Sequence, residues 1–137
     1  ILDFSDIIYV HHEVINKKEV IKKIKDKNKI PGLVLHSINE YQDLESVMSG
    51  FEQILVLSIQ KPGLSGQKFH EKSLNLINRI NSVKSRNKIT VCVDGGVKSN
   101  IINKFISEKV VSGSEVLNSN HPVRKIMMLQ TVSRYEK

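Results

Sequence analysis

The sequence predicts an α/β protein built on a parallel sheet. Short apolar runs of strand length alternate with longer segments whose apolar residues recur at helical spacing. The apolar runs show no alternation with polar residues, which is typical of strands buried on both faces of a sheet. Five such runs separated by helices favour βαβ units with right-handed crossovers. The 137 residues suffice for one ordinary domain with a hydrophobic core.

The expected strands and helices follow from this periodicity. The strands are short apolar runs rich in β-branched residues, at 6–11, 33–35, 54–59, 89–93 and 110–111. The helices carry apolar residues every three or four positions, at 17–27, 39–50, 69–85, 101–106 and 122–133. Pro31-Gly32 is expected to end the first helix before the second strand begins. Asn39 is the expected N-cap of the second helix.

Two architectures fit this order of elements. One is an open doubly wound sheet, and the other is part of a (β/α)8 barrel. A complete barrel needs at least about 200 residues, so this chain has room for about four to five of the eight units. Length alone does not decide between the two.

Composition and charge narrow the function classes. The chain carries 21 basic and 14 acidic residues, a net charge of +7. Its lysines lie mostly in the expected helices with few aromatic residues among them, which favours solvated basic faces over a nucleic-acid site. We expect neither a membrane span, which needs roughly 18 to 20 apolar residues, nor a signal peptide. With Cys92 as the one cysteine, we expect a cytoplasmic protein without disulfides.

Three glycine-containing loops follow consecutive strands. They are residues 61–67, 94–97 and 112–114. In parallel α/β proteins the carboxyl ends of the strands carry the chemistry, and glycine lets backbone N–H groups approach an anionic ligand closely. Simple turn formation explains any one of these loops. Three in consecutive units, one of them beside a strand-end acid, favour a phosphate site at this edge.

Asp94 ends an apolar strand and is followed by Gly95 and Gly96. A carboxylate at this position can cap the next helix or pair with Lys98. It is equally the place at which parallel α/β enzymes put a general acid or base. The residues alone leave both interpretations open.

Four segments of the chain resemble the ribulose-phosphate 3-epimerase family. Residues 62–69 (PGLSGQKF) are followed, after a helix, by residues 93–97 (VDGGV) and then by SGS at 112–114. The strand DIIYVHHE at 6–13 resembles the fourth strand of that family. The resemblance implies a (β/α)8 TIM barrel of the ribulose-phosphate-binding type, represented from about the fourth strand onward. Residues 1–137 would then be a single domain, the C-terminal part of that barrel.

Members of this family interconvert ribulose 5-phosphate and xylulose 5-phosphate. The reaction removes a proton next to a ketone, passes through an ene-diolate and returns a proton to the opposite face, so it uses two acid/base groups. The resemblance implies that Asp94 is one of these groups. It also implies that Asp94 binds one divalent metal ion, of the zinc, iron or manganese type, which would hold the enediolate oxygens. The residues that it assigns to the substrate phosphate and this end of the site are Gly66, Gly95, Gly96, Gly113 and Ser114.

The chain departs from the family at the remaining ligands. The family's second acid and other metal ligands, two histidines and an aspartate, lie on its second and third strands, whereas this sequence opens at about the fourth. His11 and His12 are neighbours on a strand and point to opposite faces, so they cannot share a metal. His11 and Glu13 share a face and are expected to line or support the site without binding metal.

Other residues are expected in supporting roles. The remaining histidines show no ligand spacing, and we expect surface or capping roles for His36, His70 and His121. Cys92 lies within a strand and is expected to pack in the core. Residues 108–109 run directly from an expected helix into a strand, where the family has a turn, so we expect residues to be absent at this join.

The leading hypothesis is therefore an isomerase acting on a pentulose 5-phosphate. An epimerase acting on a hexulose 6-phosphate is a close variant, between which the loops do not decide. A non-catalytic or truncated relative that binds sugar phosphates is a second class, and a basic nucleic-acid-binding or scaffold protein is a third. We expect a small-molecule sugar phosphate as ligand and no nucleic-acid or membrane partner. We also expect a homo-oligomer, and a partial barrel exposes a sheet edge that is unstable alone.

Overall fold

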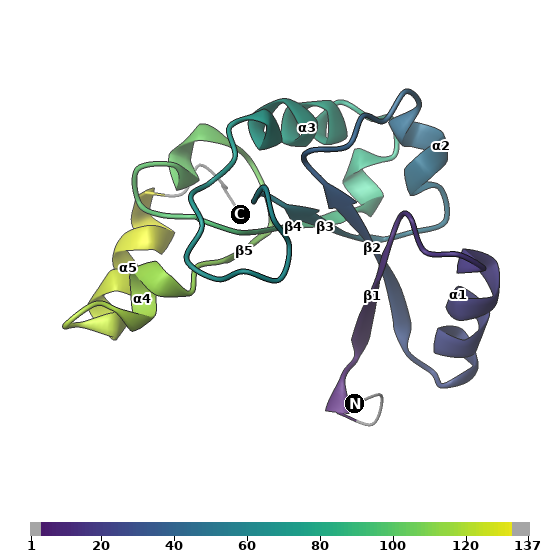
Figure 1. Ribbon diagram of the computed structural model, residues 1–137, viewed down its shortest axis with the longest axis horizontal. Coiled ribbons are helices and arrows are strands. Elements are labelled where there is room, and N and C mark those ends of the chain that lie inside the picture. The colour runs from purple at the N-terminus through teal and green to yellow at the C-terminus, as the bar shows by residue number, and fades with distance from the viewer. Residues whose placement is uncertain (1–3, 133–137) are drawn as a thin grey trace.

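The computed structural model describes residues 4–132, which form a five-stranded parallel sheet with helices in the connections (Figure 1). The strands are β1 (Ile7–His11), β2 (Ile30–His36), β3 (Gln53–Leu57), β4 (Thr90–Asp94) and β5 (Lys109–Val111). The helices are α1 (Lys17–Asp26), α2 (Leu44–Met48), α3 (Lys72–Asn81), α4 (Ser114–Leu117) and α5 (Pro122–Val132). Two 3-10 turns flank β4, η2 (Arg86–Lys88) and η3 (Ile102–Lys104). No helix among these residues is long and apolar enough to cross a membrane.

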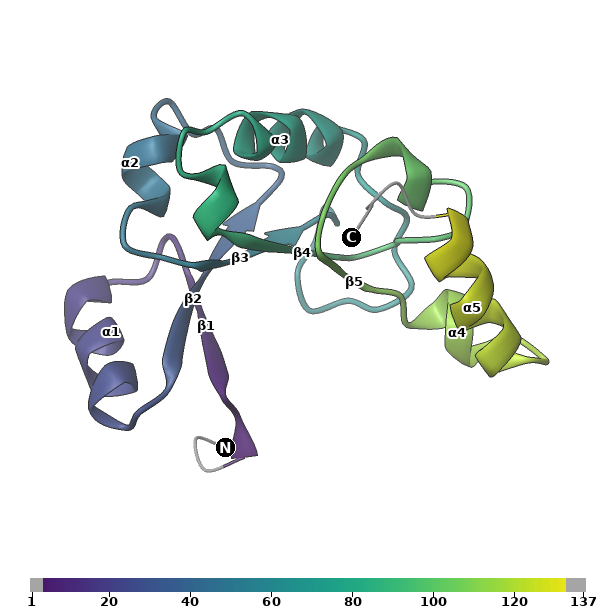
Figure 2. The same ribbon diagram turned by 180° about the vertical axis from the view of Figure 1, so that it is seen from behind.

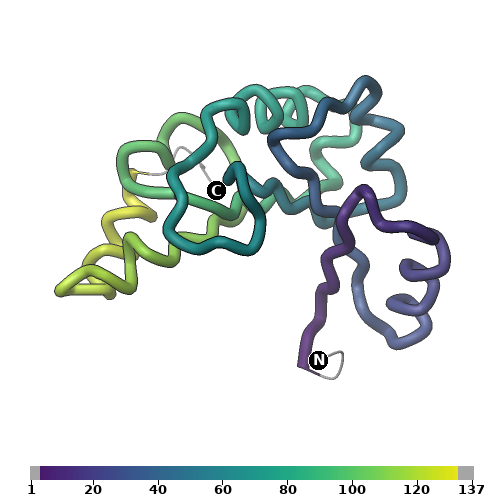
Figure 3. Tube along the Cα trace, in the orientation of Figure 1, coloured from purple at the N-terminus to yellow at the C-terminus, as the bar shows by residue number. Residues whose placement is uncertain are grey.

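The strands lie side by side in their order along the chain, β1-β2-β3-β4-β5, and every neighbouring pair is parallel. The tube in Figure 3 traces this succession from the purple to the yellow end. A doubly wound sheet reverses its strand order at a switch point, whereas a (β/α)8 barrel does not. The prediction of a parallel α/β fold is confirmed, and the order favours part of a barrel over the doubly wound alternative.

One face of the sheet forms the hydrophobic core with α2 and α3, which lie along the same side of the sheet in Figures 1 and 2. Alternate residues of β2, β3 and β4 on this face are completely buried, namely Leu33, Leu35, Ile54, Val56, Val91 and Val93. Burial of a side chain of this size contributes about 1.5–3 kcal/mol. The residues between them point to the other face, where Leu55 and Leu57 stay partly exposed.

The second strand starts earlier than the sequence predicts, because Pro31 and Gly32 lie inside β2 and do not precede it. The register pairs Gly32 with Tyr9 of β1. A Cβ atom on Gly32 would lie 2.6 Å from the Cε1 atom of Tyr9, so the absence of a side chain makes room for the tyrosine ring. This glycine therefore serves close packing between strands and not a turn.

Several helices differ from their predicted bounds. The N-cap of α2 is Asp43 and not Asn39, because the Asp43 side chain accepts a 3.1 Å hydrogen bond from a backbone N–H of the first turn. The helix predicted at 69–85 is confirmed over the shorter span of α3, and a separate 3-10 turn follows it. The helix predicted at 101–106 is reduced to η3. Ser133, the predicted end of the last helix, lies outside the described residues.

An ion pair and a hydrogen bond hold the connection into β5. A carboxylate oxygen of Glu108 lies 2.6 Å from Nη2 of Arg86, and the other accepts a 2.7 Å hydrogen bond from the Val91 N–H. Because η3 ends at Lys104, no helix runs directly into the strand, contrary to the expectation for this join. The absence of residues there stays a prediction.

Glu108→Gln tests this connection. Glutamine keeps an acceptor for the Val91 N–H but removes the charge that pairs with Arg86, whose side chain is only 18% exposed. We expect the free energy of unfolding of the intact protein to fall by about 1–2 kcal/mol, measured by urea denaturation. Asp26→Asn is the control, because it breaks an exposed pair with Lys22 and is expected to cost less than about 0.5 kcal/mol. Equal losses in the two variants would contradict a structural role of the Glu108 pair.

Candidate active site

The carboxyl ends of the five strands form one edge of the sheet, because all strands are parallel. The register pairs Asp94, at the end of β4, with Leu57 of β3 on one side and with Val111 of β5 on the other. Residues paired in this way point to the same face of a parallel sheet. The Asp94 side chain therefore lies between two apolar residues, on the face that turns away from α2 and α3.

Within the part of the chain that the structure describes, Asp94 is a half-buried carboxylate without a partner. Among the described residues its side chain forms neither an ion pair nor a hydrogen bond, so helix capping and pairing with Lys98 are not observed. Burial raises the pKa of Asp94 above its usual value. A carboxyl group whose pKa moves toward neutral pH is suited both to take up and to release a proton.

Cys92 lies two residues before Asp94 and points to the same face of the sheet. Burial and the nearby Asp94 charge together raise the pKa of the Cys92 thiol to about 11. The thiol is therefore protonated at neutral pH and is a poor nucleophile. The prediction that Cys92 is a buried packing residue is confirmed, since it is only 8% exposed.

The loop after β4 lies directly against the segment that follows β3. Gly95 and Gly96 have φ angles of 120° and 65°, in the region that favours glycine. A Cβ atom on Gly95 would lie 2.5 Å from Cγ2 of Ile59, and one on Gly96 would overlap the backbone of Phe69. Among the described residues, no acceptor receives the Gly96 N–H. A backbone donor is thus available close to Asp94, as an anion site requires.

The loop after β3 is closed by the glutamine of the PGLSGQKF motif. Oε1 of Gln67 accepts a 3.0 Å hydrogen bond from the Lys61 N–H, and Nε2 donates to the carbonyls of Lys61 and Leu64. Gly63 and Gly66 in this loop have φ angles of 89° and 74°. The glutamine therefore shapes a compact loop in which Gly66 stays exposed.

The loop after β5 is tied to the loop after β4. The Ser112 hydroxyl donates a 2.7 Å hydrogen bond to the Val97 carbonyl. Gly113 is exposed, with open space where a Cβ atom would stand, and the exposed Ser114 begins α4. The loops after β4 and β5 thus lie together at one edge of the sheet, next to residues that follow β3. The phosphate-binding role of each residue stays a prediction.

Two histidines connect the ends of β2 and β3, which the sequence did not predict. His36 is only 6% exposed, and its Nε2 atom lies 2.7 Å from the carbonyl oxygen of Ile59, so the surface or capping role expected for it is wrong. Nδ1 of His70 lies 3.0 Å from the Ser37 hydroxyl. The only signal in the sequence was the polar pair at 36–37 directly after an apolar run.

The residues after β1 form contacts of their own. His11 is exposed at the end of the strand, and the Glu13 carboxylate accepts a hydrogen bond from the Asn39 side chain. Nδ1 of His12 lies 3.2 Å from Nζ of Lys17. That His11 and Glu13 line or support the site stays a prediction.

The described residues do not form a metal site. Among them, no group of three or more His, Cys, Asp or Glu side chains lies together in a way that could hold an ion. Cys92 is the one cysteine of the chain, and its raised pKa keeps the thiol protonated, whereas a thiol that binds a metal must lose its proton. Residues 4–132 therefore do not by themselves complete the divalent metal site that the resemblance implies, and metal binding at Asp94 stays a prediction.

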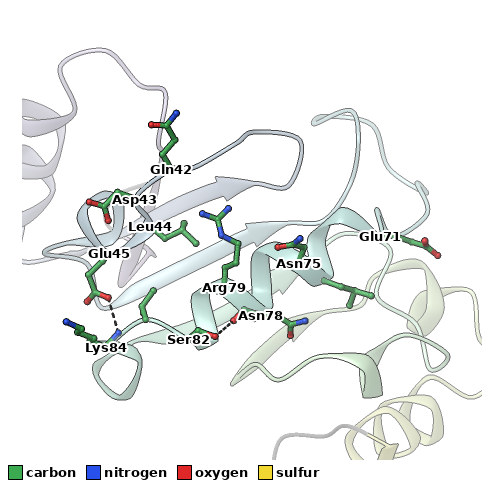
Figure 4. A pocket seen from close by; sticks show the side chains of 12 residues that line it. Gln42, Asp43, Leu44, Glu45, Glu71, Asn75, Asn78, Arg79, Ser82 and Lys84 are labelled. Atoms are coloured by element: carbon green, nitrogen blue, oxygen red, sulfur yellow. Dashed lines mark hydrogen bonds between the residues drawn. The ribbon is translucent and has the colours of Figure 1, made fainter.

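A groove between α2 and α3 is separate from this edge of the sheet (Figure 4). Two of its charged side chains already have partners. Glu45 accepts a 2.9 Å hydrogen bond from the Lys84 N–H, and Arg79 donates to the carbonyl of Tyr41. Because α2 and α3 cover the face of the sheet that is opposite to Asp94, this groove is not part of the candidate site.

Known proteins match this chain in sequence. The sequence model described as the Ribulose-phosphate 3 epimerase family matches residues 3–117. The chain is 37% identical over 120 residues to a ribulose-phosphate 3-epimerase of Buchnera aphidicola subsp. Baizongia pistaciae, and 29% identical over 119 residues to one of Encephalitozoon cuniculi. The two alignments cover 83% and 86% of this chain but only 52% and 53% of the relatives. The chain thus spans about half the length of the curated relatives it matches.

Solved structures match this chain in fold. The crystal structure of 3-hexulose-6-phosphate synthase from Salmonella typhimurium superposes with a TM-score of 0.67 at 16% identity, covering 94% of this chain and 62% of that chain. Another crystal structure of 3-hexulose-6-phosphate synthase gives a TM-score of 0.56 at 18% identity, covering 95% of this chain and 63% of that chain. These matches concern the fold alone, and the expected partial (β/α)8 barrel is confirmed.

Asp94→Asn is expected to stabilise the folded protein at neutral pH. Because burial raises the pKa of Asp94, the folded state binds this proton more tightly than the unfolded state does. The contribution of the group to stability is therefore greatest below its unfolded pKa and falls as the pH rises toward the raised folded pKa. We therefore expect the melting temperature of the variant to exceed that of the wild type by a margin that grows as the pH is raised from about 3 to about 8. A difference that does not change with pH would contradict a buried charge.

Proposed function

Because the chain belongs to the ribulose-phosphate 3-epimerase family, we propose that it forms part of an isomerase active site that interconverts ribulose 5-phosphate and xylulose 5-phosphate. The observation that carries this proposal is the unpartnered, half-buried Asp94 at a strand end, next to two glycines that lie against the segment after β3. Since the chain spans about half the length of its curated relatives, the proposal concerns the intact protein.

Asp94 serves as one of the two acid/base groups. Its carboxylate takes the proton from the carbon next to the ketone, and the electron pair of that bond forms the ene-diolate. A second acid then returns a proton to the same carbon from the opposite face, which inverts its configuration. The raised pKa of Asp94 favours both directions of this transfer. In the family, the second acid lies on strands that have no counterpart among the described residues.

The three glycine loops hold the substrate phosphate. The free N–H of Gly96 supports this role directly, because a phosphate oxygen needs a donor that is not already bonded. The remaining assignments are Gly66, Gly113 and Ser114, which are exposed, and Gly95, which is partly exposed. At the glycines, backbone groups can approach the ligand with no side chain in the way.

The cofactor and the assembly belong to the same proposal. A divalent metal of the zinc, iron or manganese type at Asp94 would need further ligands from outside residues 4–132. The small-molecule sugar phosphate is the ligand, and a homo-oligomer is the assembly. Among the described residues, β1 and β5 each have a single neighbouring strand, and the open edge of each would be covered either by further strands of the barrel or by a partner in the assembly.

A non-catalytic sugar-phosphate-binding relative is the second candidate. The observation that supports it is the Gly96 N–H, which has no acceptor among the described residues and can bind a phosphate with or without a proton transfer. Such a protein would bind the phosphate through the glycine loops without exchanging a proton. An epimerase acting on a hexulose 6-phosphate differs from the first candidate in its substrate alone.

Incorporation of solvent deuterium tests the role of Asp94. In D2O, the intact protein is expected to exchange the proton next to the ketone of ribulose 5-phosphate. Asp94→Asn is expected to slow this exchange by roughly 10²–10⁴-fold, because asparagine cannot accept a proton. Asp26→Asn, at an exposed aspartate on α1, is the matched control and should keep the wild-type rate. Exchange that survives Asp94→Asn would contradict the assigned role.

The same assay separates the candidates. Binding of ribulose 5-phosphate by the wild-type protein without exchange would favour the non-catalytic relative. Exchange with a hexulose 6-phosphate and not with ribulose 5-phosphate would favour the variant substrate.

A further inference from the structure

We propose that Ser58 is a positioning residue that orients the peptide between Gly95 and Gly96 for phosphate binding, an inference that rests on the proposed function. Ser58 follows β3 directly and is completely buried. Its Oγ atom lies 2.8 Å from the carbonyl oxygen of Asp94 and 2.7 Å from that of Gly95. The hydroxyl thus shares its one proton between two consecutive carbonyl groups of the loop after β4.

The position of the Gly95 carbonyl fixes the direction of the next N–H group. In a trans peptide the C=O and N–H bonds point in opposite directions, and no peptide bond among the described residues is cis. Because the Gly95 carbonyl points to Ser58, the Gly96 N–H points away from β3. No acceptor among the described residues receives it, so it is available to an oxygen of the ligand.

The Ser58 hydroxyl forms a hydrogen bond that no backbone N–H group of the described residues forms. The Ser58 N–H donates a 2.8 Å hydrogen bond to the Asp94 carbonyl and so continues the pairing of β3 with β4. The Gly95 carbonyl lies beyond this pairing, and among the described residues the Ser58 hydroxyl is its one donor. Since glycine restricts its own dihedral angles least of all residues, this hydroxyl is what selects one orientation of the peptide.

Ser58 is itself held in place. The His70 N–H donates a 2.7 Å hydrogen bond to the Ser58 carbonyl, which joins the end of β3 to the segment before α3. With no exposed surface, the serine hydroxyl has no contact with bulk water that would compete for the two carbonyl groups. Ser58 is therefore held rigidly, and its hydrogen bonds to the loop after β4 orient that loop.

The test compares Ser58→Ala with Ser73→Ala in the intact protein. Ser73 is a matched control because it is also completely buried, while its hydroxyl has no hydrogen-bond partner. The probe is inorganic phosphate, and its dissociation constant is read from the amide shift of Gly96 in 15N–1H spectra. We expect Ser58→Ala to weaken phosphate binding roughly fivefold, the factor for one neutral hydrogen bond, and Ser73→Ala to leave it unchanged.

Two outcomes would overturn the inference. If Ser58→Ala binds phosphate as tightly as the wild type, even with a lower melting temperature, then the serine is merely structural and the proposed function stands. If phosphate does not shift the wild-type Gly96 amide, then the N–H is not a phosphate donor, and deuterium exchange still decides separately on Asp94.

A second pair of variants applies where Ser58→Ala does not fold. Ser58→Thr and Ser58→Val have nearly the same shape and differ in the hydroxyl, so any cost of the added methyl group is common to both. The threonine variant is expected to bind phosphate severalfold more tightly than the valine variant. Equal affinities of these two variants would overturn the inference.

Discussion

The candidate site depends on the close contact between the loop after β4 and the segment after β3. Gly95 and Gly96 lie so close to Ile59 and Phe69 that a Cβ atom on either glycine would overlap or crowd them. This contact brings the loop into reach of the buried hydroxyl at the end of β3. The parallel register pairs Asp94 with Leu57, the last residue of β3, and so places the acid at the same edge of the sheet. The acid and the backbone donor are therefore placed by one set of contacts.

Local patterns in the sequence predicted the parallel fold and the edge at which the site lies. Apolar runs, helical spacing and glycine loops are local signals, so they placed Asp94 at a strand end. Contacts between distant segments have no such signal. Gly32 looked like a breaker because its reason, the ring of Tyr9, lies on another strand. His36 looked like a surface residue because its partner, the Ile59 carbonyl, lies in the next βα unit. A buried serine after a strand carries no pattern at all.

The face that carries the acid is also the face that the described residues leave partly open. Parallel sheets are normally covered on both faces, yet α2 and α3 cover one, and Leu55 and Leu57 on the other stay partly exposed. β1 and β5 each leave one edge unpaired among these residues. Both features agree with a partial (β/α)8 barrel, in which the inner face is filled by side chains from all eight strands. The proposed chemistry thus lies where this sheet is least complete.

The electrostatic environment of Asp94 on this face agrees with the proposed catalytic role and not with a stabilising one. A carboxylate buried without a partner destabilises a fold, and an amide or an ion pair would avoid that cost. Asp94 has no ion-pair partner among residues 4–132, and its charge also contributes to the raised pKa of Cys92. A phosphate held near this negative charge needs donors of its own. The Gly96 N–H, directed away from β3 by the Gly95 carbonyl, provides one without neutralising the acid. In the proposed reaction, the acid would therefore stay basic enough to take a proton while the phosphate binds at a separate place.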